Sequence, residues 1–184
     1  MYRMNLKEEL DKFYATYHLP ENGGVNNKTF GVPLPFFPLT LPNFNWRRKR
    51  LYIHDLEHIL NKQDTTWRGE MFIASWEIAT GFWRYFPLCI FPLWTMGFGL
   101  WKHPSSVYKG FNKGSQDTGI AALNFSRENL LLLNVEKLHE LTENKKSSNK
   151  LLIYLRLLFW SVVSTVVFLS PLIVFISTIY LIMK

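Results

Sequence analysis

An uncharged run near the C-terminus, residues 157–183, constrains the fold of this chain more than any other feature. As an α-helix, this run would be about 40 Å long at a rise of 1.5 Å per residue, whereas the hydrocarbon core of a bilayer is about 30 Å thick. The length favours one span, tilted or kinked at Pro171, because each of two spans would need about 17 residues or more. We therefore expect a folded body followed by a single-pass C-terminal transmembrane helix.

The charges on either side of this run predict how it is oriented. Lys145, Lys146, Lys150 and Arg156 precede the run, and only Lys184 follows it. Positively charged flanks remain on the cytoplasmic side of a span. We expect the body on the cytoplasmic side of a bacterial cytoplasmic membrane or on the matrix side of a mitochondrial inner membrane.

The net charge of +7 suits an anionic partner, either nucleic acid or an anionic membrane surface. A basic cluster, Arg47, Arg48, Lys49 and Arg50, favours contact with anionic lipid headgroups, with plain solvated charge as the alternative. No zinc finger, RNA-recognition motif or long basic helix is present, so nucleic acid is not an expected partner. Cys89 is the single cysteine, which excludes an intramolecular disulfide and a thiolate zinc cluster.

Hydrophobic spacing predicts an all-α body that precedes the anchor. Four prolines in residues 31–42 exclude a helix there and favour an extended connector. We divide the chain into four parts. These are an N-terminal helix with the proline-rich connector (1–45), a helical metal-binding domain (46–143), a polar and basic linker (144–156) and the transmembrane helix (157–183).

Within the helical domain, the strongest patterns are two helices joined by a short turn. The first is expected from about Arg47 to Gln63, and the second from Trp67 to Thr80, with Gly81 as its stop. A turn this short implies an antiparallel pair. For the rest of the domain we expect an apolar helix over 85–101 that is buried or grazes the membrane. Loops, with room for a short helix, are expected over 103–124, and a helix capped by Ser126 over 126–141.

Four side chains on this predicted helix pair form the candidate metal site. His54 and His58 are one turn apart, about 40° around the helix, so both imidazoles lie on one face. Asp55 lies at the edge of that face, and Glu70 follows His58 after eleven residues, in the first turn of the second helix. Glu77, seven residues after Glu70, is expected as an outer partner of a ligand histidine.

This donor set suits Zn²⁺, with Fe²⁺ and Mn²⁺ as alternatives. Other metal enzymes fit less well. Zinc proteases of the HExxH type need Glu directly after the first histidine, where this chain has Asp55. Histidine-box enzymes need more histidines, and His18, His103 and His139 are isolated in the sequence.

The spaced motif resembles the hallmark of a known family, that of the fourth coenzyme Q biosynthesis protein, which reads HDxxH, eleven residues, then E. His54, Asp55, His58 and Glu70 match it at that spacing. Further similarity comes from Gly69 before the glutamate, Trp76 with Glu77, and the segment FPLCI at 86–90. The likeness covers roughly residues 45–142, whereas the C-terminal span and the proline-rich segment have no counterpart in it.

The resemblance implies a helical fold, a divalent metal and a prenylated quinone precursor as ligand. The implied role is in ubiquinone biosynthesis, both in organising the other quinone-biosynthesis enzymes and in replacing the C1 carboxyl of the ring by hydroxyl, with a homo-oligomer as a further expectation. Two other hypotheses stay open at this point. One is a non-catalytic lipid-binding or scaffold protein with a structural metal, and the other is a metal-dependent lipid hydrolase.

Overall fold

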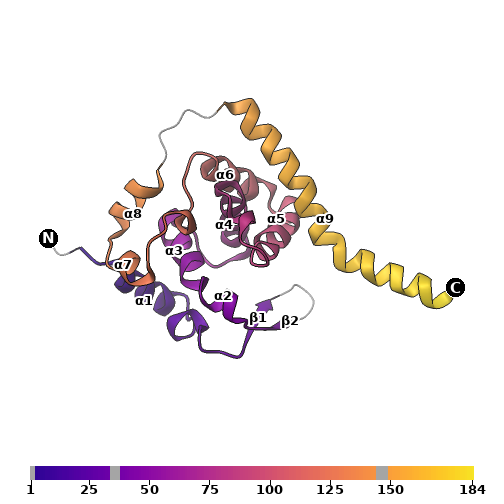
Figure 1. The fold of residues 1–184 in the computed structure, drawn as a ribbon, viewed down its shortest axis with the longest axis horizontal. Helices are drawn as coiled ribbons and strands as arrows, with labels where there is room; N and C mark the ends of the chain where they lie inside the picture. Colours follow the sequence, from indigo (N-terminus) through magenta and orange to yellow (C-terminus); the bar gives the residue numbers. More distant parts are fainter. Residues whose placement is uncertain (1–2, 34–37, 144–148) are drawn as a thin grey trace. The chain divides into compact units, whose positions relative to one another are not determined.

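The computed structural model shows a mostly helical chain and describes residues 3–33, 38–143 and 149–184 (Figure 1). The expected all-α class is confirmed, with one short two-stranded sheet in addition. The chain divides into two compact units, Met1–Lys62 with Ile120–Thr142, and Gln63–Gly119 with Glu143–Lys184. Residues 46–143, expected as one domain, thus contribute to both units.

The first unit begins with α1 (Leu6–Thr16), whose start is set by a capping box. The Asn5 side chain accepts a hydrogen bond from the Glu8 backbone N–H, and the Glu8 carboxylate accepts one from the Asn5 N–H, each 3.0 Å long. Leu6, Leu10, Phe13 and Tyr14 recur at helical spacing and form the buried face of α1. A short 3-10 turn, η1 (Glu21–Gly24), follows.

Two extended strands, β1 (Thr29–Pro33) and β2 (Pro38–Pro42), follow this turn and pair antiparallel. The expectation that the proline-rich segment is extended is therefore confirmed for its described residues, while 34–37 lie outside them. The pairing of the strands was not expected. Pro33 faces Pro38, and Thr29 faces Pro42, so the prolines occupy strand ends, where they interrupt the hydrogen-bond ladder least.

The helix expected from Arg47 to Gln63 is divided into α2 (Asn45–Arg48) and α3 (Leu51–Asn61). Lys62 ends α3 in the left-handed conformation, with a φ of 52°.

The helix expected over 126–141 is also divided, into α7 (Arg127–Leu131) and α8 (Val135–Thr142). Ser126 caps α7 as expected, with its hydroxyl accepting from the Asn129 N–H at 3.2 Å. Asn134 starts α8, because its side-chain oxygen accepts from the Lys137 N–H at 2.8 Å. A short turn, η3 (Ile120–Ala122), precedes both helices.

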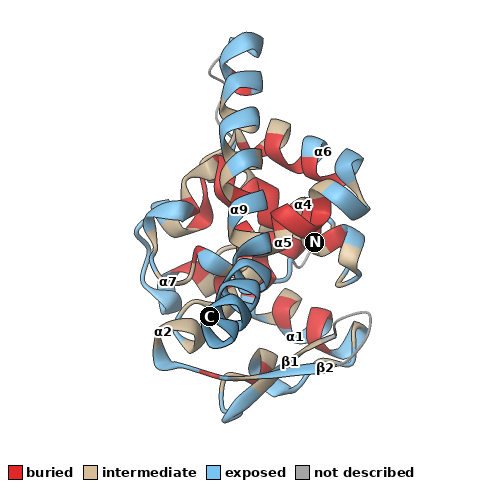
Figure 2. Cartoon of the chain, turned by 90° about the vertical axis from the view of Figure 1, so that its right-hand side faces the viewer, coloured by how far each residue is buried: buried red, intermediate tan, exposed pale blue. Residues whose placement is uncertain are grey.

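The second unit is a helical cluster around α4 (Trp67–Thr80), which has the expected bounds and ends at Gly81 with a φ of 101°. After a 3-10 turn, the chain forms two further helices and finally the long C-terminal helix. These elements are η2 (Phe82–Arg84), α5 (Ile90–Lys102), α6 (Pro104–Gly114) and α9 (Lys150–Met183). Figure 2 shows the buried residues of α4 and α5 in red and the mostly exposed α9 in pale blue.

Helix α6 occupies Pro104–Gly114, in the stretch where the sequence favoured loops with a short helix. Pro104 occupies its first turn, where a missing N–H costs nothing. Gly110 and Gly114 allow α6 to approach α4 closely: a Cβ at Gly110 would overlap the Phe72 carbonyl oxygen, and one at Gly114 would overlap the Trp76 backbone. Tertiary packing thus stabilises a helix that glycine propensity opposes.

Helix α9 is long and apolar enough to cross a membrane. It begins at Lys150, inside the segment expected as a linker, while Lys145 and Lys146 lie outside the described residues. Its first half packs against the other helices of the second unit. The Arg156 side chain donates a 2.9 Å hydrogen bond to the Ala79 carbonyl oxygen.

Candidate metal centre

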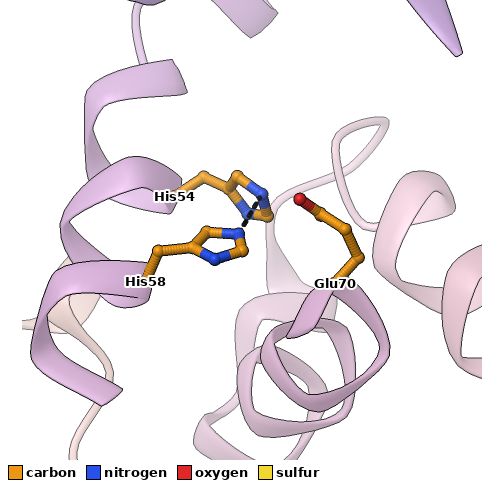
Figure 3. Close-up of side chains that lie close together, drawn as sticks. All are labelled: His54, His58 and Glu70. Atoms are coloured by element: carbon orange, nitrogen blue, oxygen red, sulfur yellow. Dashed lines mark hydrogen bonds between the residues drawn. The ribbon is translucent and has the colours of Figure 1, made fainter. Parts of the chain in front are cut away.

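The two histidines of α3 lie side by side within the first unit. Their Nε2 atoms are 3.3 Å apart, within hydrogen-bond distance, and Figure 3 marks this contact with a dashed line. Their ring centroids are 4.9 Å apart. His58 is 1% exposed, and Phe13 of α1 packs 5.8 Å from its ring. This packing fixes one of the two imidazoles, as a preorganised ligand requires.

The separation of these two nitrogens fits a shared metal ion. Zinc–nitrogen bonds of about 2.0–2.1 Å at a tetrahedral angle place two nitrogen ligands about 3.3–3.4 Å apart. His54 and His58 already have that separation. The separation, which is also within hydrogen-bond distance, is thus compatible with one cation bound by both imidazoles.

Asp55 has a hydrogen-bond partner in α1. It is buried, and its Oδ2 accepts a 2.9 Å hydrogen bond from the Tyr14 hydroxyl. Burial, followed by the neighbouring Asp55 carboxylate, raises the pKa of Tyr14, so its hydroxyl remains a donor at neutral pH. A Cβ at Gly23, which has a φ of 67°, would approach this carboxylate oxygen to 2.8 Å, so a glycine is required beside it.

We expect Tyr14→Phe to lower the free energy of unfolding by about 1–3 kcal/mol, because a buried carboxylate loses a hydrogen-bond donor. Tyr17→Phe is the matched control: it removes a hydroxyl just after the same helix that forms no side-chain hydrogen bond among the described residues. Chemical denaturation of both variants measures the difference. Equal stability of the two variants would show that the bond to Asp55 contributes nothing.

Glu57 is a buried acid that the motif did not single out. It is 1% exposed on α3, one turn from His54 and adjacent to His58 in sequence. A carboxylate is seldom buried this deeply unless it is paired or bound to a cation. The signal available in the sequence was its three-residue spacing from His54, which places it near the histidine face.

The remaining acids belong to the second unit, on α4. Glu70 is half-buried in the first turn, where its N–H donates to the Thr66 carbonyl oxygen at 2.9 Å. Glu77 is 3% exposed, two turns further along. Only residues 62–66 connect α3 to α4, so Glu70 follows the end of the histidine helix by a few residues along the chain.

The described residues thus contain His and Glu side chains that could hold a metal ion. One set is His54, His58 and Glu70, the residues labelled in Figure 3, and the other is His54, Glu57 and Glu77. Asp55 belongs to neither set. Its role as a ligand, the outer role of Glu77 and the antiparallel arrangement of the two helices stay predictions.

Arg47 and Arg48 of the basic cluster form local contacts within the first unit. Arg47 donates a 2.9 Å hydrogen bond to Asn43 Oδ1, and its guanidinium lies 3.7 Å from the centroid of the Phe30 ring. Burial lowers the pKa of Arg47 from its ordinary value. Arg48 donates to the Asn27 carbonyl oxygen, whereas Lys49 is exposed. The expected headgroup contact of this cluster stays a prediction, with Lys49 the residue best placed for it.

Comparison of the chain with family models, curated proteins and solved structures gives no match.

Proposed function

We propose that this protein acts in the biosynthesis of ubiquinone or a related prenylated quinone, at a membrane and with one divalent metal ion. The observation that carries the proposal is the pair of histidines with metal-ligand separation inside the motif HDLEH, followed after eleven residues by Glu70. The resemblance of this spaced motif to a quinone-biosynthesis family supplies the substrate class.

In this proposal His54, His58 and Glu70 bind the cation, with Zn²⁺ favoured over Fe²⁺ or Mn²⁺ by the donor types. When bound, such a cation polarises a carboxylate or an oxygen of the precursor ring as a Lewis acid. Asp55 is the fourth candidate ligand, and we expect it to be the weaker one because Tyr14 already donates to it. Three strong protein ligands leave room for substrate, as catalytic sites require.

The long apolar helix α9 supports the membrane location, since a polyprenyl chain partitions into the bilayer. Lys150 and Arg156 precede the uncharged run, and Lys184 follows it, so we propose that the body lies on the cytoplasmic or matrix side. The enzyme would then meet its substrate at the membrane surface.

A deletion strain complemented with the wild type or with Glu70→Ala tests the proposed function. We expect the deletion and the Glu70→Ala strain to lose quinone and to accumulate a carboxylated prenyl intermediate, measured by mass spectrometry. Glu136→Ala, a matched change at an exposed acid of α8, should restore quinone fully.

The other outcomes decide between the remaining hypotheses. Recovery of quinone with Glu70→Ala, after loss in the deletion, would favour a scaffold whose metal is not catalytic. Unchanged quinone in the deletion strain would exclude the biosynthetic role and leave lipid binding or lipid hydrolysis.

A further inference from the structure

The second unit carries a cluster of aromatic rings where α9 leaves the other helices. Phe98 of α5 is its centre, with ring centroids 5.2 Å from Trp67, 6.0 Å from Trp94, 6.5 Å from Trp101 and 5.7 Å from Phe168. Trp94 also lies 5.3 Å from Phe168. We call these five residues, Trp67, Trp94, Phe98, Trp101 and Phe168, the aromatic collar.

Beyond this collar, none of the residues that the structure describes buries α9. Every residue of 169–184 is exposed, although 169–183 contain no charge. Figure 1 shows this part of α9, in yellow, extending past α5. The free part has 15 residues, or about 22 Å of helix at 1.5 Å per residue.

This free part is too short to cross a bilayer by itself. A hydrocarbon core of about 30 Å takes about 20 helical residues, and about 17 at the minimum. The charged Lys184 ends the uncharged run, so an uncharged span of that length, counted back from Met183, begins between Ser164 and Val167. That stretch of α9 packs on α5: a Cβ at Gly97 would overlap the Ser164 carbonyl oxygen, and Phe168 contacts Trp94 and Phe98.

Gly97 and Phe98 of α5 pack against Ser164 and Phe168 of α9, so the C-terminal part of α5 lies beside the stretch of α9 where the span begins. Any bilayer that covers α9 from about Ser164 onward therefore also reaches the end of α5.

The residues at this end have the chemistry of a membrane interface. Trp101 is 78% exposed, although it is among the largest apolar side chains, and Lys102 beside it is exposed as well. Tryptophan is enriched where hydrocarbon meets headgroups, and lysine can bury its stem there while its ammonium group reaches phosphate.

We propose that the exposed edge of the aromatic collar, formed by Trp101, lies in the bilayer, with Trp101 inserted about 5–10 Å into the boundary between headgroups and acyl chains, the depth typical of interfacial helices. The C-terminal end of α5 then enters the membrane beside α9, and the bilayer covers the exposed Trp101 while Phe98 stays buried within the protein. The inference requires α9 to span the membrane, but it is independent of the metal and of quinone chemistry.

Spin-label depth measurements on the full chain test this proposal. In a Cys89→Ala background, a nitroxide is attached at Trp101→Cys, at Tyr154→Cys on the early part of α9, or at Ile173→Cys on its free part. The protein is reconstituted in vesicles of pure phosphatidylcholine, so that charge attraction does not contribute. Electron paramagnetic resonance then compares the accessibility of each label to oxygen and to a water-soluble nickel complex.

We expect the Ile173 label to be deep in the bilayer, the Tyr154 label to be in water and the Trp101 label to be intermediate. A Trp101 label as accessible to nickel as the Tyr154 label would overturn the proposal, because Trp101 would then lie in water, outside the membrane. An Ile173 label in water would overturn the proposal as well, because α9 would then not cross the membrane.

A second measurement needs no label. Lipids brominated near the top of the acyl chain quench tryptophan fluorescence at that depth. Trp101→Phe should reduce the quenching observed for the wild type, whereas Trp76→Phe, at a fully buried position of α4, should not reduce it. Equal quenching of the wild type and Trp101→Phe would contradict insertion of Trp101.

Discussion

Purified wild-type protein should contain about one divalent ion per chain, and His58→Ala should lose it. The two Nε2 atoms of His54 and His58 lie at the separation that one tetrahedral ion requires, and removal of one imidazole destroys that arrangement. Loss of an outer partner alone typically costs 10–100-fold in metal affinity, so loss of a ligand should cost at least about 100-fold. Elemental analysis and competition with a chelator measure both quantities.

His58 is fully buried, so its replacement also removes packing against Phe13. Glu70→Gln separates metal loss from this packing effect, because Glu70 is half-buried and glutamine keeps its shape. His139→Ala, an isolated histidine on α8, is the matched control and should keep the full metal content. A wild type that is folded and metal-free, or full metal content in both site variants, would exclude the proposed site.

The same ion should stabilise the fold. A ligand that binds only the native state adds about 2.7 kcal/mol when its free concentration is 100 times its Kd. We therefore expect zinc to raise the free energy of unfolding of the wild type and to have little effect on His58→Ala or Glu70→Gln.

Gly110→Val should destabilise the second unit by about 3 kcal/mol or more, at the upper end of what overpacking costs. A Cβ at Gly110 would overlap the Phe72 carbonyl oxygen and the Ser75 hydroxyl, so α6 must move away from α4. The overlapped carbonyl oxygen belongs to the backbone of α4, which cannot move aside as the end of a flexible side chain could. Denaturant titration in detergent micelles, monitored by tryptophan fluorescence, measures the loss.

Gly31→Val is the matched control for this change. A Cβ at Gly31 meets nothing within 4 Å, and Gly31 lies in β1, where valine is well suited. We expect a change within about 0.5 kcal/mol, as for most exposed positions. If Gly110→Val were as stable as Gly31→Val, close packing of α6 on α4 would not be what holds this unit together.

Local sequence patterns predicted the elements whose signals act within a few residues. The uncharged run 157–183 falls within α9, because length and lack of charge are properties of the segment itself. Helix α4 has the predicted bounds, and Gly81 ends it in a conformation that glycine adopts readily. The shared face of His54 and His58 likewise follows from a four-residue spacing on one helix.

Tertiary structure decided the features that depend on residues far apart in sequence. Tyr14 binds Asp55 across 41 positions, which no motif indicated. Helix α6 forms in a glycine-containing stretch because close approach to α4 outweighs the intrinsic cost of glycine, and the proline-rich strands pair only when the chain turns back on itself. The aromatic collar needs Phe168 beside Phe98, and neither segment specifies that contact alone. Sequence spacing fixes which groups share one helix face, whereas burial of apolar surface between distant segments selects which faces meet.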